Sequence, residues 1–152
     1  MIRRVQLNDI DDIMVIERQS FPIPWEYSIF LNICLHCGEK TSSKSKALFM
    51  DVMEKNGRVI GYAVWELDSS KSRGHILNLA IQQDERRRGN GRILLTHVIN
   101  HLRSNGIRLC RLEVRESNIP ARALYEGYGF IVSSKISEYY FDEDAIVYTL
   151  YL

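Results

Sequence analysis

The chain is organised around one stretch, Asp84-Glu85-Arg86-Arg87-Arg88-Gly89-Asn90-Gly91-Arg92. An apolar, strand-like run at residues 76–81 comes before it, and an amphipathic helical pattern follows it. Glycines let backbone N–H groups approach a ligand closely. The first turn of a helix carries unpaired N–H donors at the positive end of its dipole, and arginine adds charge-assisted hydrogen bonds. This order of strand, basic glycine turn and helix predicts a binding site for a phosphate-bearing ligand.

The segments on either side of this turn predict an α/β (α+β) fold. Strands are expected at residues 2–6, 47–54, 59–67, 75–81, 108–115, 130–140 and 145–151, where apolar residues alternate or run on continuously. Helices are expected from Asn8 or Asp9 to Ser20, at 26–35, from the glycine turn to Asn105, and at 121–125 after the cap Ser117-Asn118. Asn56-Gly57 is a hairpin signal. We therefore expect a single domain over residues 1–152, with a mixed sheet of about seven strands and about four helices.

The composition and charge narrow the class of protein. A length of 152 residues favours one domain, and a formal net charge of +1 gives no reason to expect a nucleic-acid or membrane-surface partner. No apolar run approaches the roughly 20 residues that a membrane span needs, and the N-terminus lacks an apolar signal-peptide core. The expected location is the cytoplasm, with no nucleic acid and no membrane as partners.

Three cysteines argue against a secreted disulfide scaffold. Cys34 and Cys37 form a Cys-x-x-Cys pair, but a structural zinc site needs four ligands and no second pair exists. A thioredoxin-like redox site would follow a strand, whereas a helical pattern precedes this pair. We expect no metal, with small residues at a helix end and one exposed thiol, although a redox or metal role for the pair stays open. Residues 38–46 after it predict a polar, mobile loop.

Three phosphate ligands compete for the glycine turn. A Walker-type nucleotide site requires Gly-x-x-x-x-Gly-Lys-Ser/Thr, which is absent from the sequence. A dinucleotide site requires Gly-x-Gly-x-x-Gly, and here Leu94 stands in place of the third glycine, although Glu113 could nominally supply the ribose-binding acid. Coenzyme A is the third candidate. The turn alone does not separate the last two.

A resemblance to a known family favours coenzyme A. Residues 86–91 resemble the Arg/Gln-x-x-Gly-x-Gly/Ala signature of the GNAT superfamily of N-acetyltransferases. Residues 112–118 and 123–130 are similar to the second half of the N-terminal protein acetyltransferases, and the closest branch is that of the ribosomal-protein-alanine N-acetyltransferases. Phe21-Pro22-Ile23-Pro24-Trp25, and Tyr139-Tyr140 before Glu143-Asp144-Ala145, are similar to two further features of that branch. The resemblance covers nearly the whole chain except the loop around residues 37–46.

The resemblance implies a GNAT fold whose sheet splays between the fourth and fifth strands, residues 75–81 and 108–115. Acetyl-CoA would lie in that gap, its pantetheine paired with one strand edge and its pyrophosphate on the amides of the basic turn. The implied cofactor-binding residues are Leu79, Ala80, Ile81, Arg86, Arg87, Arg88, Gly89, Asn90, Gly91, Arg92, Asn118 and Tyr125.

Acetyl transfer to an α-amine needs a base and an acid. An α-amine, with a pKa of about 8, is partly neutral near pH 7, so a carboxylate acting through water can suffice as the base. Glu113 is the candidate, because it lies on the strand face opposite the core residues, where Arg111 and Arg115 should keep it ionised. The alternative is a carboxylate in a surface ion-pair ladder.

Tyr125 is the candidate acid, because a phenol carries its proton at neutral pH and can donate it to a thiolate. The alternative is a ring packed beneath the turn at residues 127–129. The resemblance further implies that His75 helps to hold a catalytic water beside Glu113, although a lone histidine at a strand end is often only a surface residue.

The peptide-side groove is expected to be lined by Phe21, Pro22, Trp25, Tyr139 and Tyr140. These could equally be core, turn and closing-strand residues. Some relatives carry a glutamate after Leu-Pro, where this chain has Ile23, a departure that favours substrates with a small first residue.

The expected activity is direct acetyl transfer from acetyl-CoA to the N-terminal α-amine of a protein, with a monomer or weak homodimer as the active form. The resemblance implies a ribosomal protein as the acceptor. No serine or cysteine nucleophile with a partnered base is evident, which agrees with transfer without a covalent enzyme intermediate. Two alternatives stay open: acetylation of a small-molecule amine on the same fold, and a non-catalytic acyl-CoA-binding module.

Overall fold

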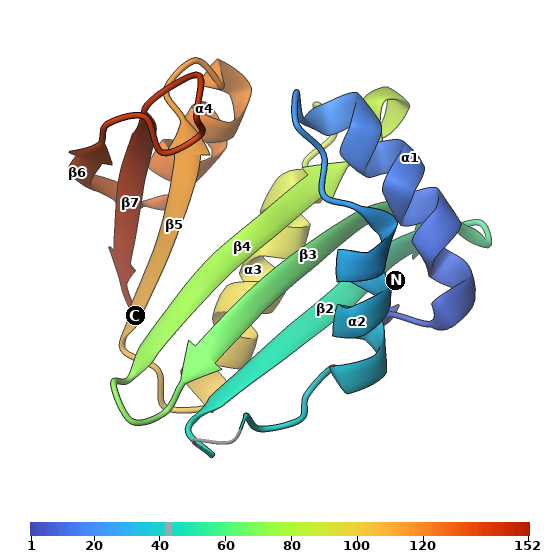
Figure 1. Cartoon of the computed structure of the whole chain (residues 1–152), viewed down its shortest axis with the longest axis horizontal. Helices are drawn as coiled ribbons and strands as arrows, with labels where there is room; N and C mark the ends of the chain where they lie inside the picture. Colours follow the sequence, from blue (N-terminus) through green and yellow to red (C-terminus); the bar gives the residue numbers. More distant parts are fainter. Residues whose placement is uncertain (42–43) are drawn as a thin grey trace.

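The computed structural model describes residues 1–41 and 44–152 (Figure 1). The described residues form a seven-stranded mixed sheet in the order β1-β2-β3-β4-β5-β7-β6. The strands are β1 (Ile2–Arg4), β2 (Lys46–Lys55), β3 (Arg58–Asp68), β4 (Arg73–Ile81), β5 (Leu109–Arg115), β6 (Ile131–Ile136) and β7 (Ala145–Tyr151). The helices are α1 (Ile10–Ser20), α2 (Tyr27–His36), α3 (Asn90–Ser104) and α4 (Ile119–Tyr128), with short 3-10 helices η1 (Leu7–Asp9) and η2 (Gln83–Glu85). The predicted fold class is confirmed.

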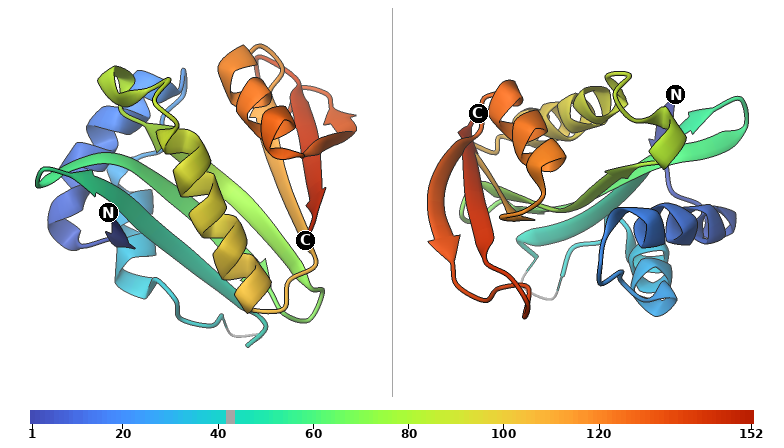
Figure 2. Two further views of the ribbon diagram at one scale, coloured as in Figure 1. Left: turned by 180° about the vertical axis from the view of Figure 1, so that it is seen from behind. Right: turned by 90° about the horizontal axis from the view of Figure 1, so that it is seen from above.

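Helices cover both faces of the sheet: α1 and α2 lie on one face, and α3 and α4 on the other (Figure 2). The spacing of Ile10, Ile13 and Met14 gives α1 one apolar side, which is buried with Phe30 of α2 against Tyr62 of β3. The cluster on the opposite face holds the buried leucines of α3 and Trp65. Each fully buried side chain of this size contributes roughly 1.5–3 kcal/mol.

The central strand β4 parts from β5 after a short pairing. The two strands are parallel neighbours only from Arg73↔Leu109 to Ile76↔Leu112, and beyond that point they separate (Figure 1). On its other edge β4 stays paired with β3 up to Ile81. Along 77–81, therefore, the β5-facing edge of β4 has no strand partner in the described part of the chain, and the predicted splay is confirmed.

A β-bulge lies at the point where the splay begins. Trp65 pairs with Ile76 and its neighbour Val64 pairs with Asn78, so Leu77 is an extra residue on β4. Residues two apart normally share a face of a strand, and the extra residue breaks this rule. Ile76 consequently packs in the α3-side cluster, whereas Asn78 is buried beside α1.

The predicted boundaries hold for most elements but not for the sixth strand. The prediction of a strand over 130–140 is wrong, because β6 ends at Ile136 and the chain then turns. Glu138 and Phe141 have left-handed φ angles of 54° and 69°, which an extended strand excludes. Tyr139 and Tyr140 therefore lie in the β6–β7 connection and not on a strand.

Local signals account for other turns and caps. Asn56 and Gly57 have φ angles of 52° and 76°, as a type I′ hairpin turn requires, so the predicted hairpin is confirmed. The predicted cap of α4 is also confirmed, because the Asn118 side chain accepts a hydrogen bond from Ala121 N at 3.2 Å. That helix begins at Ile119, two residues before the predicted start.

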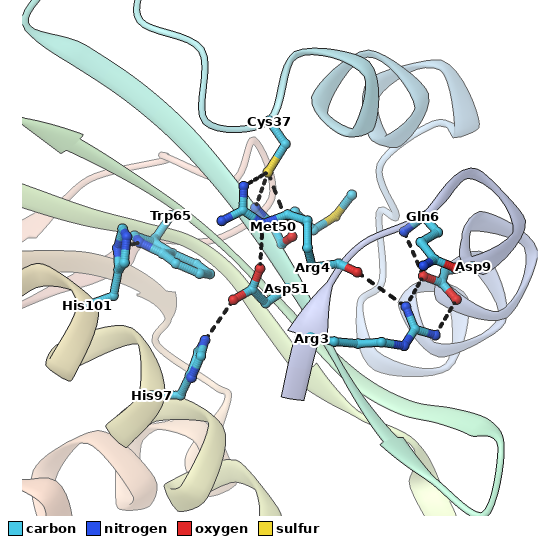
Figure 3. A network of polar contacts seen from close by, with 10 residues as sticks. All are labelled: Arg3, Arg4, Gln6, Asp9, Cys37, Met50, Asp51, Trp65, His97 and His101. Atoms are coloured by element: carbon cyan, nitrogen blue, oxygen red, sulfur yellow. Dashed lines mark hydrogen bonds and ion pairs between the residues drawn. The ribbon is translucent and has the colours of Figure 1, made fainter. Parts of the chain in front are cut away.

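Cys37 is held in a polar network that joins the end of α2 to the β1–β2 edge (Figure 3). Its sulfur accepts hydrogen bonds from Met50 N at 3.1 Å and Arg4 Nη1 at 3.4 Å. Arg4 also pairs with Asp51, which is 2.7 Å from His97 of α3. Cys34 and Cys37 are both half-buried, so the expectation of an exposed thiol is wrong. Cys110 is buried in the core.

Over 1–41 and 44–152, no group of three or more His, Cys, Asp or Glu side chains is placed to hold a metal ion. Within the same residues, no helix is long and apolar enough to cross a membrane. The loop predicted at 38–46 includes residues 42 and 43, which lie outside the described residues.

Candidate active site

A cavity of about 610 Å³ opens where β4 and β5 separate. Five segments line it: α1 with the connection that follows it, β4, β5, the start of α4, and the β6–β7 connection. The predicted site residues in its lining are Phe21, Pro22, Trp25, Leu79, Glu113, Asn118, Tyr125, Tyr139 and Tyr140. Residues far apart in the sequence, predicted for three different roles, thus share one cavity.

Glu113 of β5 is held by His75 of β4. His75 Nε2 lies 2.5 Å from Glu113 Oε2, and Arg111 Nε lies 3.2 Å from Glu113 Oε1. The Glu113 side chain is only 7% exposed, and its burial alone would raise the pKa of this carboxyl. The hydrogen bond and charge of His75, together with Arg111, outweigh burial and hold the pKa of Glu113 below its ordinary value. The surface ion-pair alternative does not fit this degree of burial.

His75 itself is not part of the cavity lining, although it touches the carboxylate that is. It pairs with Arg111 in the last parallel stretch of β4 and β5, one residue before Ile76. The structure therefore places His75 behind Glu113, in a position to orient that side chain.

Arg115 does not share in holding Glu113, contrary to the expectation. Its guanidinium forms ion pairs with Asp142 at 2.8 Å and Glu143 at 3.3 Å, and stacks over the Tyr140 ring at 4.6 Å. The acidic β6–β7 connection folds back over the end of β5, so these carboxylates lie nearer to Arg115. The residue instead fixes Tyr140 in the cavity wall.

Tyr125 lies on the other side of the cavity, on α4. It is buried, its ring packs edge-on against Phe130, and it also contacts Tyr148. Burial, with a smaller effect of Cys110, raises the pKa of Tyr125 above its ordinary value. The phenol therefore keeps its proton at every pH at which the protein would work, and both expected features, a packed ring and a held proton, occur together.

Aromatic residues form the wall opposite the strands. Trp25 packs against Phe30 with ring centroids 5.5 Å apart, and Tyr139 meets Tyr140 edge-on at 4.9 Å. Pro22 is exposed at the cavity rim. The two connections that carry these residues thus face each other across the opening.

The basic turn lies between η2 and the first residues of α3, beyond Ala80 and Ile81 at the end of β4. Arg87 and Gly89 have left-handed φ angles of 60° and 83°. Alternation of this kind turns successive N–H groups toward one side and makes a concave anion-binding backbone. Gly91 faces α4, where an added Cβ would lie 3.3 Å from Leu124 Cδ2, so a larger residue would require the Leu124 side chain to shift.

The four arginines of this turn are held differently. Arg86 donates to Ile81 O at 2.9 Å and to Ser20 Oγ at 2.9 Å, so it ties the turn to β4 and α1. Arg92 lies over the Tyr128 ring at 5.0 Å. Arg88 is 3.8 Å from Glu85, whereas Arg87 is exposed and has no ion pair within the described residues. Asn90 caps the turn by donating to the backbone oxygen of Glu85 at 2.9 Å.

A buried polar pair in the cavity wall was not predicted from the sequence. Glu17 of α1 and Asn78 of β4 both line the cavity, and Asn78 Nδ2 donates to Glu17 Oε2 at 2.8 Å. The sequence does carry a signal for Glu17, because this charged residue falls on the apolar side of α1, three positions after Met14. Asn78 is the one polar residue in the run 76–81 of β4.

Comparison with known proteins gives consistent matches. Residues 10–130 match the acetyltransferase (GNAT) family. The chain is 29% identical to the ribosomal protein bS18-alanine N-acetyltransferase of Escherichia coli, over 98% of this chain and 95% of the relative. It is 30% identical to an N-alpha-acetyltransferase of Saccharolobus solfataricus, over 95% and 88% of the two chains. The crystal structure of the Escherichia coli ribosomal-protein-S18-alanine N-acetyltransferase superposes with a TM-score of 0.82 at 30% identity, covering 99% and 92%.

Proposed function

Because the chain belongs to the GNAT family of acetyltransferases, we propose that it transfers an acetyl group from acetyl-CoA to the N-terminal α-amine of a protein. The likeness to the ribosomal-protein-alanine N-acetyltransferase of Escherichia coli, over nearly the full length, supports a ribosomal protein as the acceptor. The observation that carries the proposal is the ionised Glu113, backed by His75, in the same cavity as the protonated Tyr125. We propose that residues 1–152 form one such domain and act as a monomer or weak homodimer.

The residues present fit acetyl-CoA. The free edge of β4 at Leu79, Ala80 and Ile81 offers backbone groups to an extended amide-bearing chain, as an added strand would. The turn at residues 86–91 offers concave backbone N–H groups and the start of a 15-residue helix to a pyrophosphate. Exposed Arg87 and Arg88 add charge at that end, and Asn118 lines the cavity from α4.

When bound, acetyl-CoA supplies an activated acetyl group and a thiolate leaving group. In our assignment, Glu113 accepts a proton from the attacking amine, directly or through a water, and His75 holds the Glu113 carboxylate in place. The amine would take the acetyl group as the bond from that group to sulfur breaks, and Tyr125 would supply the proton that the leaving thiolate needs. Solvent then takes the proton from Glu113 and returns one to Tyr125. The pKa directions agree with these roles, because the base is ionised and the acid is protonated at neutral pH.

The acceptor side supports a peptide with a small first residue. Phe21, Trp25, Tyr139 and Tyr140 give the cavity aromatic walls, which suit an extended chain that enters between the two connections. Ile23 also lines the cavity, at the position where the resemblance implies a substrate-binding glutamate in some relatives of Met-Glu-type selectivity. An isoleucine there offers no charge to a substrate.

The experiment is an acetylation assay over a panel of acceptors. The protein would be incubated with acetyl-CoA and peptides that start with Ala, Ser or Met-Glu, with an N-terminally blocked peptide bearing one internal lysine, and with a polyamine and an aminoglycoside. Release of free thiol would be followed with time. We expect turnover with the Ala and Ser peptides. Turnover with the polyamine or aminoglycoside alone, or no thiol release above background with any N-terminus, would rule out the proposal.

A further inference from the structure

A buried polar cluster joins α1, β3 and β4 beside the cavity. The Glu17 carboxylate lies at its centre and is 1% exposed. Tyr62 donates its hydroxyl hydrogen to Glu17 Oε2, and Trp25 N donates to Oε1 at 3.2 Å. Asn78 Nδ2 donates to both oxygens, at 3.1 Å and 2.8 Å, and is 3.5 Å from the Tyr62 hydroxyl. None of these groups has a role in the acetyl-transfer steps assigned above, and only Trp25 has another assignment, in the aromatic wall of the cavity.

The cluster contributes little to the stability of the fold for the hydration free energy that its burial removes. A buried carboxylate loses its hydration, and burial raises the pKa of Glu17 while the three donors oppose that rise. Apolar side chains of the same volume usually stabilise a core at least as well as a buried ionic group. The cluster lies at the wall of the cavity, where Glu17 and Asn78 are both part of the lining. Its polar groups are therefore candidates for a contact with a ligand in the cavity.

The carboxylate fixes the orientation of the Asn78 amide. Tyr62, Trp25 N and Asn78 Nδ2 all donate to the Glu17 oxygens, so the Asn78 nitrogen faces Glu17 and its oxygen points the other way. Asn78 Oδ1 has no hydrogen-bond partner within residues 1–41 and 44–152. In that same part of the chain, every fully buried side-chain nitrogen or oxygen does have a partner, so Oδ1 is open to the cavity that Asn78 lines.

Asn78 lies on the same side of the sheet as the proposed base. Cys110, Leu112 and Val114 of β5 face the α3-side core, so Glu113 faces the α1 side. The bulge at Leu77 turns Asn78 to the α1 side as well. Glu113 is one residue past the last β4–β5 pair, and Asn78 is two residues past it on the facing strand. Two hydrogen-bond acceptors thus flank the narrow end of the splay, one ionised and one neutral.

We propose that Asn78 Oδ1 accepts a hydrogen bond from the substrate α-amine, with Glu17 as the residue that positions the Asn78 amide. This inference rests on the proposed function. A neutral amine has two N–H bonds, and Glu113 serves one of them. Acceptance of the other by Asn78 leaves the nitrogen lone pair free for the acetyl carbon. A neutral amide oxygen also favours the charged ammonium form less than a second carboxylate would.

The test is a comparison of two peptides bound to the enzyme–CoA complex at about pH 8.5, where much of an α-amine is neutral. One peptide starts with Ala, and the other is its des-amino analogue, with a propionyl group in place of the alanyl residue. Calorimetry gives the dissociation constant of each peptide. The dissociation constant of the des-amino peptide divided by that of the Ala peptide measures how much the amine contributes to binding. We expect Asn78→Ala to reduce this ratio roughly 3- to 10-fold, the worth of one hydrogen bond, with coenzyme A affinity unchanged.

Glu17→Gln is the second variant. It is needed if Asn78→Ala does not fold because the buried Glu17 carboxylate has lost its hydrogen bonds from Asn78. A glutamine nitrogen at the Oε2 position can donate to Asn78 Oδ1, which turns the Asn78 nitrogen toward the cavity and reduces the same ratio. Tyr62→Phe is the matched control: it removes a donor from Glu17 but leaves the orientation of Asn78 unchanged, so it should lower the unfolding temperature and keep the ratio.

Three outcomes would overturn the inference: an unchanged ratio in both Asn78→Ala and Glu17→Gln, an equal loss of the two peptides' affinities, or a loss in Tyr62→Phe as large as in Glu17→Gln. The equal loss would assign Asn78 to a backbone N–H of the peptide or to packing. These failures are distinct from a failure of the proposed function, which is judged on the wild-type protein by thiol release alone.

Discussion

Glu113 stands where two neighbouring strands part, and its neighbours decide its chemistry. A carboxylate that is 7% exposed would be a poor base at neutral pH if it were protonated. The contact with His75 at 2.5 Å and the ion pair with Arg111 keep it ionised instead. A base that is fully ionised and shielded from water can act on an amine that is already partly neutral.

Replacement of the base should reduce turnover without weakening the binding of the cofactor. We expect Glu113→Gln to reduce kcat by about 10²-fold or more, the usual range for loss of a general base, with the dissociation constant of acetyl-CoA within about twofold of wild type. Glu116→Gln is the matched control, because Glu116 lies on the same segment in an exposed ion pair with Lys135. A wild-type kcat in Glu113→Gln would remove Glu113 from the mechanism.

Tyr125→Phe should have a similar effect for a different reason. The variant keeps the ring that packs against Phe130 and removes only the proton donor. We expect kcat to fall about 10²-fold, while the unfolding temperature stays close to that of wild type. Tyr151→Phe, at an exposed position, is the control. An equally active Tyr125→Phe would leave Tyr125 a purely structural ring.

The pKa directions also fix the shape of the pH profile. Glu113 has a pKa below its ordinary value and Tyr125 one above it, so neither should change protonation between about pH 6 and pH 9. The rise of kcat/KM with pH should therefore follow the α-amine of the peptide and shift with its pKa. Peptides with α-amines of different pKa check this. If kcat/KM rises at the same pH for every peptide, the group that titrates belongs to the enzyme, and this would contradict the assignment.

Among the single residues, the sequence predicted the proposed base and acid, Glu113 and Tyr125, but missed Glu17 and Asn78. Glu113 could be predicted because strand alternation separates it from Cys110 and Leu112. Asn78 could not, because its direction depends on the bulge at Leu77, which brings it to the side opposite the one that alternation from Ile76 predicts. No local signal in β4 marks that bulge.

Among the elements, the turn before α3 carries one arginine that is bonded within the protein and one that is open to solvent. Arg86 bonds to Ile81 O and Ser20 Oγ, whereas Arg87 is exposed with no ion pair among the described residues. We expect Arg87→Ala to weaken acetyl-CoA binding, with an affinity that depends less on salt than in wild type, and to leave the unfolding temperature unchanged. Arg86→Ala should lower the unfolding temperature. Equal salt dependence in Arg87→Ala and wild type would contradict a phosphate contact.

Helix α3 also makes a pH-sensitive contact with the sheet. His101 Nδ1 accepts a hydrogen bond from Trp65 Nε1 at 3.1 Å. Burial lowers the pKa of His101 below 6.5, more than the nearby Asp51 raises it. Because the folded pKa is lower than the unfolded one, this group's contribution to stability is present above about pH 6.5 and is lost as the pH falls through the folded pKa.

His101→Asn tests this contact, because an asparagine Oδ1 can replace Nδ1 as the acceptor and does not titrate. The unfolding free energy, measured by denaturant titration, should fall less between about pH 8 and pH 5.5 in the variant than in wild type. His36→Asn, at an exposed position, is the matched control. An identical pH dependence in wild type and His101→Asn would refute the assignment.

The elements themselves followed from apolar periodicity, and the exceptions have physical causes. The strand predicted over 130–140 failed because Glu138 adopts a left-handed φ, and Asp144 accepts a hydrogen bond from its backbone N–H at 2.9 Å. A side chain that accepts a hydrogen bond from a backbone N–H competes with the hydrogen bonds between strands. The alternation of apolar residues carries no information about such a bond. The cap at Asn118 succeeded because its signal is local.

For the whole molecule, the order of the strands and the splay between β4 and β5 create the cavity. Local patterns predicted the strands, but the splay came only from the resemblance to the GNAT superfamily, because nothing in β4 or β5 alone limits their pairing to Arg73↔Leu109 through Ile76↔Leu112. The cavity therefore depends on long-range organisation: the connections that carry Trp25 and Tyr140 both line it, although they are far apart in the chain.

The most direct test of N-α-acetyl transfer is to locate the acetyl group on a product. A peptide with an N-terminal alanine and one internal lysine would be incubated with the protein and acetyl-CoA, and fragmented in a mass spectrometer. We expect a single acetyl group on the alanine nitrogen, and none when Glu113→Gln replaces wild type over the same interval. An acetyl group on the lysine alone would contradict N-α-acetyl transfer. So would an unmodified peptide when the protein is saturated with acetyl-CoA.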